Sequence, residues 1–468
     1  MTAQSQPETF MARFGDLPEE TVLGIWPYIH PNAIESFALT CQRFYHLGAK
    51  AITKHNRLRK LYGVLVNEPS RDTRLGLSKA PRSELLINLL VDIMRESRIA
   101  YYVKEFRMQY CSDCWDDIFD DAERKRETYR HLHVLSYLLE GCKYLRQQEV
   151  TEWWDQIKIG NEDPILGLLL YLLPAVRTIR FDPCTREPAL CLGLIRRVAQ
   201  DRKCLALSRL NEVRVEAPEP NGTEDLSALS TFANLPSVSK LIGLRIADDG
   251  DVNRGNRADQ IRPDFRPKAS NVKMLELRDV NLPLKTFNLL LGMFKSLQSF
   301  TYTPCSTYWQ NERMYEFDSF VIRRAVALHA KDSLKTLTLV ACDRKKEYMG
   351  TIHDFKSLAN LTTNWGLLLP PGHIDSCTLA ATLPPSIEEV TLLVDDKFNA
   401  WRGKRLIRHL LVCTRYEHPG LGDFSLKHLA VPAMEILEND KTVEIAQATG
   451  LTLRLDNTPN VISASETR

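Results

Sequence analysis

Residues 272–277 read Val-Lys-Met-Leu-Glu-Leu, and the segment from Leu282 to Phe294 that follows carries apolar residues at helical spacing. The first segment is apolar at its first, fourth and sixth positions. Its last three residues alternate as in a strand that is buried on one face only. This stretch therefore predicts one strand and one helix of an α/β protein.

The same spacing recurs along most of the chain. Further copies begin at Val103, Val176, Leu210, Leu241, Leu297 and Leu334, and weaker ones at Leu358, Ile387 and Leu426. From Val176 onward the copies start 24 to 39 residues apart, which leaves room for one strand and one helix in each. The helical segment of a later copy is predicted at Phe320 to Ala330.

This pattern resembles the leucine-rich repeat. Its turn position, where such repeats place Asn or Cys, is occupied here by Cys111, Cys184, Cys305 and Cys342. The resemblance implies an irregular solenoid over residues 100–455, with parallel strands inside, helices outside and a helical insertion near 122–160. A different α/β fold stays open, because the spacing also arises in other Leu-rich proteins.

The residue between the last two apolar positions of each copy is expected on the concave face of such a solenoid. In the first half these residues are Arg107, Arg180, Arg214 and Arg245, and in the second half they are Glu276, Thr301, Thr338, Thr362, Thr391 and Ala430. Guanidinium groups pair with carboxylate or phosphate, so the basic stripe is a candidate site for an acidic or phosphorylated segment. A solvated strand face is the alternative.

The N-terminal region has a different pattern. Leu17-Pro18-Glu19-Glu20 suits the first turn of a helix, and Val22, Ile25, Trp26 and Ile29 then form an apolar stripe. Pro27 is expected to end or kink this helix near Trp26. His30-Pro31-Asn32 predicts a turn, after which apolar residues from Ile34 to Phe44 predict two more helices. A unit of about fifty residues buries little surface, so it is expected to leave apolar area for a partner.

Residues 17–47 resemble an F-box, the module by which substrate receptors dock on SCF-type ubiquitin ligases. The likeness extends to fungal F-box proteins with irregular repeats, although Ala33 stands where the family commonly has an acid. It implies contact with a Skp-family adaptor through Leu17 and Pro18, with the apolar body supplied by Val22, Ile25, Ile29 and Phe44. A helical hairpin packed on its own domain is the alternative.

These patterns divide the chain into five parts. They are a flexible N-terminus (1–13), an F-box (14–62), a linker with a capping helix at Ser83 to Arg95 (63–99), the repeats (100–455) and a flexible tail (456–468).

Composition bounds the class of protein. The chain has 468 residues, a net charge of +2 and eleven cysteines at irregular spacing, which favour reduced thiols. No apolar run has spanning length and the N-terminus does not resemble a secretory leader, so the expected compartment is cytoplasm or nucleus. The near-neutral charge argues against nucleic-acid or membrane partners.

Three clusters of residues could indicate other chemistry. Cys111-x-x-Cys114 with His131 and His133 could hold zinc, and Asp249-x-Asp251-x-Asn253 resembles the start of a calcium loop, but neither has the usual spacing. The basic run from Lys54 to Lys60 is expected to be a solvated helix face, and contact with an acidic surface of the ligase or a weak import signal are the alternatives. With no nucleotide-binding, zinc-protease or serine-hydrolase motif, we expect no enzyme, no catalytic residue, no metal and no cofactor.

The resemblance therefore predicts a substrate-recognition subunit of an SCF-type E3 ubiquitin ligase. The F-box would bind a Skp-family adaptor and through it a cullin, and the repeats would bind a target protein that the sequence does not identify. Two alternatives stay open, namely a scaffold that binds the adaptor outside any ubiquitin ligase, and an enzyme or ligand-binding solenoid.

Overall fold

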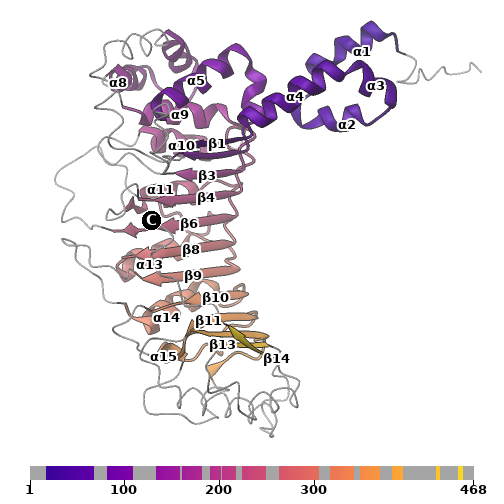
Figure 1. Cartoon of the computed structure of the whole chain (residues 1–468). Coiled ribbons are helices and arrows are strands. Elements are labelled where there is room, and N and C mark those ends of the chain that lie inside the picture. The colour runs from indigo at the N-terminus through magenta and orange to yellow at the C-terminus, as the bar shows by residue number, and fades with distance from the viewer. Residues whose placement is uncertain are drawn as a thin grey trace, which may run out of the picture.

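A computed structural model describes thirteen segments of the chain. They are residues 17–67, 82–108, 133–158, 161–181, 190–201, 203–217, 224–248, 263–304, 317–341, 348–368, 382–393, 428–432 and 452–456. These residues form a mixed α/β structure in which a helical arm projects from one end of a long parallel sheet (Figure 1). The α/β class predicted from the sequence is confirmed at this level.

The arm consists of residues 17–62. Its elements are α1 (Glu19–Ile25), η2 (Trp26–Tyr28), η3 (Pro31–Ala33), α2 (Ile34–Ala38), α3 (Gln42–Leu47) and α4 (Ala49–Tyr62). As predicted, the first α-helix ends beside Pro27, and His30 begins the next turn by accepting a hydrogen bond from Asn32 N on Nδ1. The arm has its own core, in which the Trp26 ring lies so close to Gly48 that a Cβ there would be 1.9 Å from it.

Twelve strands form the sheet, and every pair of neighbours is parallel. In order they are β1 (Val64–Asn67), β2 (Glu105–Met108), β3 (Thr178–Phe181), β4 (Glu212–Glu216), β6 (Lys240–Leu244), β8 (Met274–Val280), β9 (Ser299–Pro304), β10 (Thr336–Leu339), β11 (Asn360–Asn364), β12 (Glu389–Leu393), β13 (His428–Pro432) and β14 (Thr452–Asp456). Each strand therefore pairs with the sheet strand that follows it in the chain. A separate pair joins β5 (Glu224–Asp225) to β7 (Ile246–Ala247).

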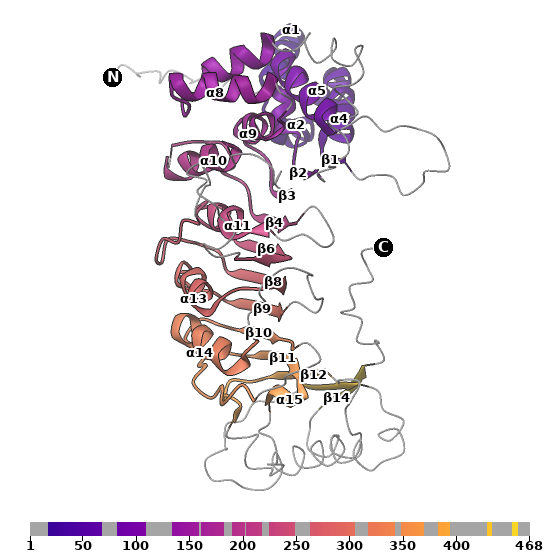
Figure 2. The same ribbon diagram turned by 90° about the vertical axis from the view of Figure 1, so that its left-hand side faces the viewer.

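The described helices between the strands cover one face of the sheet, and none of them lies on the other, which we call the open face (Figure 2). Between the strands lie α5 (Arg82–Arg95), η5 (Ser97–Tyr101), a helical segment at 133–141, α8 (Gln147–Lys158), α9 (Asp163–Leu172), α10 (Leu190–Gln200), α11 (Leu226–Ala233), α13 (Leu284–Gly292), α14 (Ser319–Ala330) and α15 (Trp365–Leu368). The helices predicted at Ser83 to Arg95, Leu282 to Phe294 and Phe320 to Ala330 are confirmed as α5, α13 and α14. Within the described segments, no helix combines the length and apolar composition that a membrane span requires.

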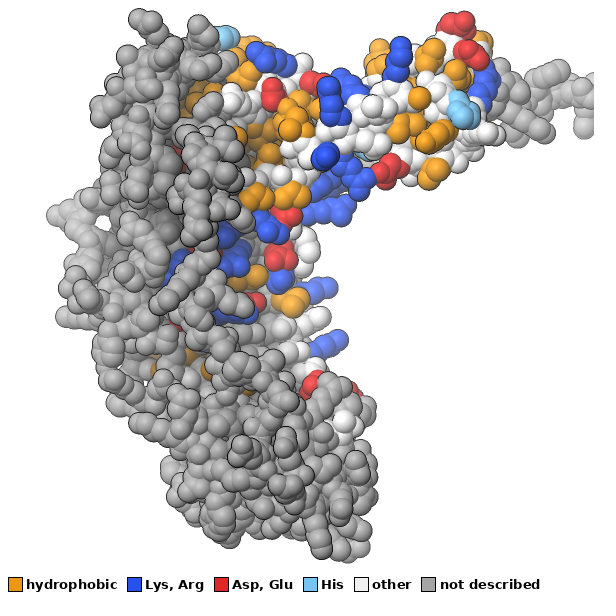
Figure 3. All heavy atoms as spheres, in the orientation of Figure 1, with side chains coloured by type: hydrophobic (Ala, Val, Ile, Leu, Met, Phe, Trp, Pro, Cys, Tyr) orange, Lys and Arg blue, Asp and Glu red, His pale blue; other side chains and the backbone are white. Residues whose placement is uncertain are grey.

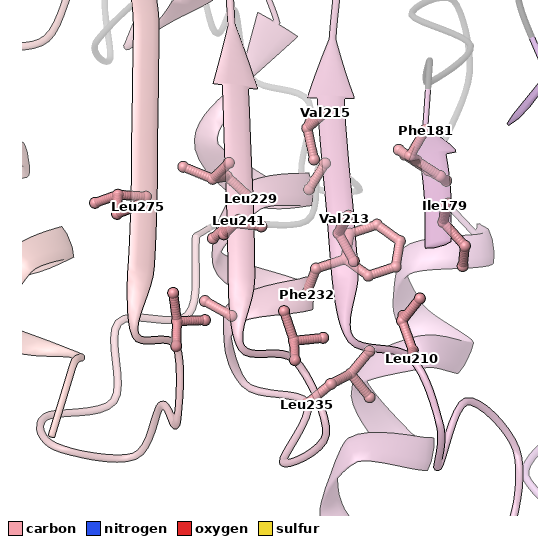
Figure 4. Packing of buried hydrophobic residues seen from close by; sticks show 14 of the residues in the cluster. Ile179, Phe181, Leu210, Val213, Val215, Leu229, Phe232, Leu235, Leu241 and Leu275 are labelled. Atoms are coloured by element: carbon pink, nitrogen blue, oxygen red, sulfur yellow. The ribbon is translucent and has the colours of Figure 1, made fainter. Parts of the chain in front are cut away.

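The core lies between the sheet and its helices. The alternating residues Ile179, Val213 and Phe300, which face the helices, are each 0% exposed. Figure 4 shows Phe232 of α11 beneath β3 and β4, and its ring meets that of Phe181 edge-on with centroids 5.1 Å apart. Each helix thus covers the apolar residues of adjacent strands, so the core runs from one unit to the next.

The predicted register is wrong at β6. The sequence suggests Leu241, Leu244 and Ile246 as the three apolar positions, but Leu241 pairs with Val213 and Gly243 with Val215. A Cβ on Gly243 would lie 2.9 Å from Ile246 Cγ1 and 3.1 Å from Leu277 Cδ2. Ile246 therefore fills the space that a third apolar side chain of the strand would need.

Two strands of the twelve-stranded sheet are absent from the prediction. β1 includes Val66 and Asn67, which the sequence places in a linker, and β14 lies beyond the last predicted copy. β1 pairs with β2 over four residues, from Val64 opposite Glu105 to Asn67 opposite Met108. The parallel sheet thus begins immediately after the arm, one strand earlier than predicted.

Neighbouring residues on opposite faces of β9 offer a test of this architecture. Phe300→Ala removes a fully buried ring, so we expect the free energy of unfolding to fall by about 3–5 kcal/mol. Thr301→Ala, on the open face, is expected to change it by less than about 0.5 kcal/mol. Urea unfolding followed by circular dichroism measures both values. Equal losses would contradict the assignment of the two faces.

Candidate partner-binding surfaces

The six residues predicted to contact an adaptor do not share one environment. Pro18 is exposed, Leu17, Ile25 and Ile29 are half-buried, and Val22 and Phe44 are buried at 0% and 2% exposure. All six lie in the arm, and Leu17 and Ile29 pack from outside against the core that Val22 and Phe44 help to form.

The burial of Val22 and Phe44 corrects the part assigned to them. Phe44 stacks on Phe37 with ring centroids 4.9 Å apart, and Phe37 meets Trp26 edge-on at 5.1 Å. The side chains of Val22 and Phe44 therefore support the arm from inside and are not accessible to a partner in this conformation. Helical periodicity identifies the apolar face of a helix, but it does not tell which part of that face the protein itself covers.

The arm exposes a different set of large apolar side chains. Tyr28 is 88% exposed and Leu39 is 80% exposed, while Tyr45 and Leu23 are exposed to 52% and 48%. Figure 3 shows orange side chains gathered over the outer part of the arm. Exposed apolar side chains that gather on a unit of this size are typical of a protein contact surface. The sequence offered only an indirect signal for them, because they are apolar residues away from the helical stripe.

The long helix α4 attaches the arm to the first elements of the sheet region. His55, 5% exposed, lies with Nδ1 3.0 Å from the hydroxyl of Tyr102, and burial lowers its pKa although Glu35 opposes the shift. Burial, together with the hydrogen bond that the Tyr62 hydroxyl donates to Asp92 Oδ2 over 2.7 Å, raises the pKa of Tyr62 to about 12. These buried contacts fix the arm relative to α5 and η5.

Residues of the basic run in α4 also form ion pairs within the protein. Lys54 Nζ is 2.8 Å from Glu96 Oε1, which joins the arm to the residue before η5. Arg59 pairs with Glu35 inside the arm.

Two further cations hold the turn of the arm. Arg98 donates to Pro27 O from Nη1 over 2.9 Å and to Ile29 O from Nη2 over 2.7 Å. Lys104 donates to Asn32 Oδ1 over 2.9 Å. Burial, followed by repulsion from neighbouring arginines, lowers the pKa of Lys104 to about 8.

The open face follows the predicted register apart from β6. Arg107 pairs with Arg180, and Arg180 with Arg214, but the next residue in this row is Ile242 and not Arg245. The row then continues as predicted through Glu276, Thr301, Thr338, Thr362, Thr391 and Ala430. The open face is thus basic near the arm and rich in hydroxyl groups further along.

Three of the four predicted arginines meet at one buried carboxylate. Arg180 Nη2 and Arg214 Nε lie 3.0 and 3.1 Å from Oε2 of Glu216, and Arg245 Nη2 lies 3.0 Å from Oε1. Glu216 has a side chain only 3% exposed. Arg245 reaches it from beyond β6, with φ at 54°, and also donates to Ala217 O over 2.7 Å.

The arginines of the basic stripe pair with carboxylates of the protein itself. The three guanidinium groups of the Glu216 cluster share one carboxylate, and Arg107 is paired with Glu105 on its own strand. Arg214, with a side chain 40% exposed, remains the most accessible of the three cluster arginines. The stripe therefore has an internal structural role that the sequence pattern did not indicate.

Most of the candidate metal residues fall outside the part of the chain that the structure describes. Cys111, Cys114, His131 and the loop from Asp249 to Asn253 lie outside the described residues, as do the turn cysteines Cys111, Cys184, Cys305 and Cys342. Among the residues that the structure describes, no group of three or more His, Cys, Asp or Glu side chains is arranged to hold a metal ion.

Two glutamates of the same strand test the Glu216 cluster. Glu216→Gln leaves three guanidinium groups without their carboxylate, so we expect a loss of about 3 kcal/mol in the free energy of unfolding. Glu212→Gln removes a half-exposed pair with Lys240 and is expected to cost less than about 1 kcal/mol. Denaturant titration of both variants makes the comparison, and a stable Glu216→Gln protein would contradict the role assigned to the cluster.

The environment of Lys104 predicts a distinct pH dependence. Because its pKa is about 8, its amine is mostly neutral above that pH, and its rate of acylation should level off there. Lys356 is the control, because its hydrogen bond to Asp332 raises its pKa above the usual 10.5 and its rate should still climb at pH 10. Mass spectrometry after brief acylation gives both profiles. Parallel profiles for the two lysines would contradict the prediction.

Comparison with known proteins leaves the resemblance of the arm and the repeats untested. No protein-family model matches the chain, and a search of curated protein sequences finds no match.

Proposed function

We propose that this chain is the substrate-recognition subunit of an SCF-type ubiquitin ligase. In this proposal the arm is an F-box that binds a Skp-family adaptor and through it a cullin, and the region from β2 onward is an irregular leucine-rich-repeat solenoid that binds a target protein. No catalytic step is assigned to the chain itself.

One observation carries the proposal. The part of the sequence that resembles an F-box, residues 17–47, forms a small helical unit that projects from the sheet and exposes Tyr28, Leu39 and Tyr45. A unit that places large apolar side chains in solvent is suited to a protein partner. The order of the sheet strands supports the second half of the proposal, since each strand pairs with its successor as in a repeat array.

The link between arm and sheet suits a receptor that works by positioning. The buried contact of His55 with Tyr102 and the ion pair of Lys54 with Glu96 hold the arm to the beginning of the sheet region. A target bound on the sheet would then have a defined place relative to a ubiquitin-conjugating enzyme bound through the arm. Such positioning raises the effective concentration of the target's lysines near that enzyme.

Two other functions remain candidates from the sequence. A scaffold would bind the adaptor without joining a ubiquitin ligase, and an enzyme or ligand-binding solenoid would use the repeats alone. The projecting apolar arm favours the first of these over the second, because a unit that served only the repeats would bury that surface against them.

Co-purification of the tagged full-length chain with the Skp-family adaptor and the cullin tests the proposal. Wild type should retain both proteins, and Leu17→Ala/Pro18→Ala and Tyr28→Ala/Leu39→Ala should each lose them. Truncation of a central interface anchor typically costs about 2 kcal/mol or more, roughly thirtyfold in affinity. The control is Leu205→Ala/Leu328→Ala, which removes two leucines exposed at 71% and 73% outside the arm.

The outcomes separate the candidates. Adaptor without cullin would select the scaffold. Failure of the wild-type chain to bind either protein would overturn the F-box assignment. Circular dichroism of each variant checks that a lost partner does not reflect an unfolded arm.

A further inference from the structure

Five cations surround the corner between the arm and the sheet. They are Arg59 of α4, Arg98 of η5, and Lys104, Arg177 and Arg209, which precede β2, β3 and β4; we call them the basic corner. Backbone hydrogen bonds bring the three segments together, since Arg177 N donates to Lys104 O over 2.7 Å and Asn211 N donates to Arg177 O over 2.8 Å. Figure 3 shows blue side chains gathered beneath the arm at this place.

The partners of these cations are mostly neutral. Arg98 donates to the carbonyls of Pro27 and Ile29, and Lys104 donates to the carbonyl of Tyr101 and the side-chain amide of Asn32. Arg177 and Arg209 have exposed side chains and no ion-pair partner within the described part of the chain. Among the described contacts of these five cations, Arg59 alone is paired with a carboxylate, that of Glu35.

Carboxylates near the corner are engaged elsewhere. Glu96 pairs with Lys54 at 2.8 Å, and Glu105 pairs with Arg107 on the open face. Asp92 accepts a hydrogen bond from the hydroxyl of Tyr62. The folded chain therefore gathers more positive charge at this corner than its described carboxylates balance.

The titration of two groups reflects this excess. After burial, the charges of Arg177, Arg209 and Arg59 lower the pKa of Lys104. After burial, the charges of Arg209, Lys104 and Arg98 lower the pKa of His30. An anion bound at the corner would relieve this mutual repulsion, which is one source of binding free energy.

We propose that the basic corner binds a short acidic segment of a partner protein. Guanidinium groups pair bidentately with carboxylates, and Arg177 and Arg209 are the two that are exposed and without a carboxylate. That this segment belongs to a ubiquitylation target rests on the proposed function, whereas the binding itself does not require an adaptor or a cullin.

Two observations favour a peptide over a nucleic acid. Along the backbone ladder that precedes the strands, the uncharged residues Asn211, Ser239 and Gln298 separate Arg177 from Lys273 and Lys335, so the positive charge does not form the continuous track that a polynucleotide backbone follows. Lys104 N donates to Gly63 O, and the next strand residues Val64 and Val66 are 52% and 38% exposed. These apolar side chains suit a peptide in which acidic residues flank an apolar one.

Fluorescence anisotropy with the full-length chain tests the proposal. The probe is a labelled twelve-residue peptide with glutamate at alternate positions and one central leucine, and its partner probe replaces each glutamate by glutamine. We expect Arg177→Gln/Arg209→Gln to bind the acidic probe about fivefold more weakly than wild type at low salt. A probe that carries phosphoserine in place of glutamate should likewise bind Arg177→Gln/Arg209→Gln more weakly than it binds wild type.

The chain offers a matched control in Lys273→Gln/Lys335→Gln. These exposed lysines stand at the equivalent position before β8 and β10, where Lys273 N and Lys335 N continue the same backbone ladder, but they lie outside the basic corner. The control should bind the acidic probe as wild type does. Equal weakening by the two double variants would overturn the proposal, because it would indicate general attraction to a cationic surface.

Three further results would also overturn it. They are equal affinity for the glutamine probe, unchanged affinity in Arg177→Gln/Arg209→Gln, and tighter binding of a single-stranded RNA of similar length through the same arginines. The arginine variant is expected to keep adaptor binding, since neither side chain lies in the arm. A failed peptide measurement and a failed adaptor measurement therefore report on different parts of the protein.

Discussion

The structure depends on burial shared between neighbouring strand–helix units. One strand of four to seven residues and one short helix cannot exclude water from their apolar faces alone. Each unit is completed by the next one, as when Phe232 of α11 packs beside Phe181 of β3. Stability therefore accumulates from one unit to its neighbour, and the backbone ladder from β1 to β14 keeps the apolar positions in line.

The same constraint explains the place of the arm. α4 leads directly into β1, so the arm is joined to the first strand of the array with no intervening linker. The contacts of His55, Tyr62, Lys54 and Lys104 place polar groups at this joint, and they include Lys104, which neighbouring arginines repel. Polar and charged groups at a joint of this kind favour one orientation, because few other arrangements satisfy their hydrogen bonds.

The sequence predicts the strands well because two periodicities coincide in it. Apolar residues such as Leu210, Val213 and Val215 mark both the spacing of the repeat and the alternation of a strand, and all three are 0% exposed. At β6 the same rule fails, since Val238, Leu241 and Ile246 allow two frames and the choice depends on space that only neighbouring units define. The pattern does not indicate β1 because Leu65 and Asn67 pair with Phe106 and Met108, so a polar residue stands at the last apolar position.

The candidate surfaces were less predictable for a related reason. Periodicity located the apolar stripe of the arm, but the division between buried Val22 and exposed Leu39 depends on how three short helices pack. The Glu216 cluster was hidden because Glu216, Arg180 and Arg245 lie far apart in the sequence and meet only when the strands align.

The sheet adds one strand at a time in a single direction away from the arm, with about 4.8 Å between neighbours. Because the arm is held to the first strand, the distance of any point on the sheet from the arm is set by the strand on which that point lies. Distance from α4 along the sheet therefore changes in steps of one strand spacing. Insertion or loss of one strand with its connection would move every later strand by one such spacing relative to the arm and leave the side chains of those strands unchanged.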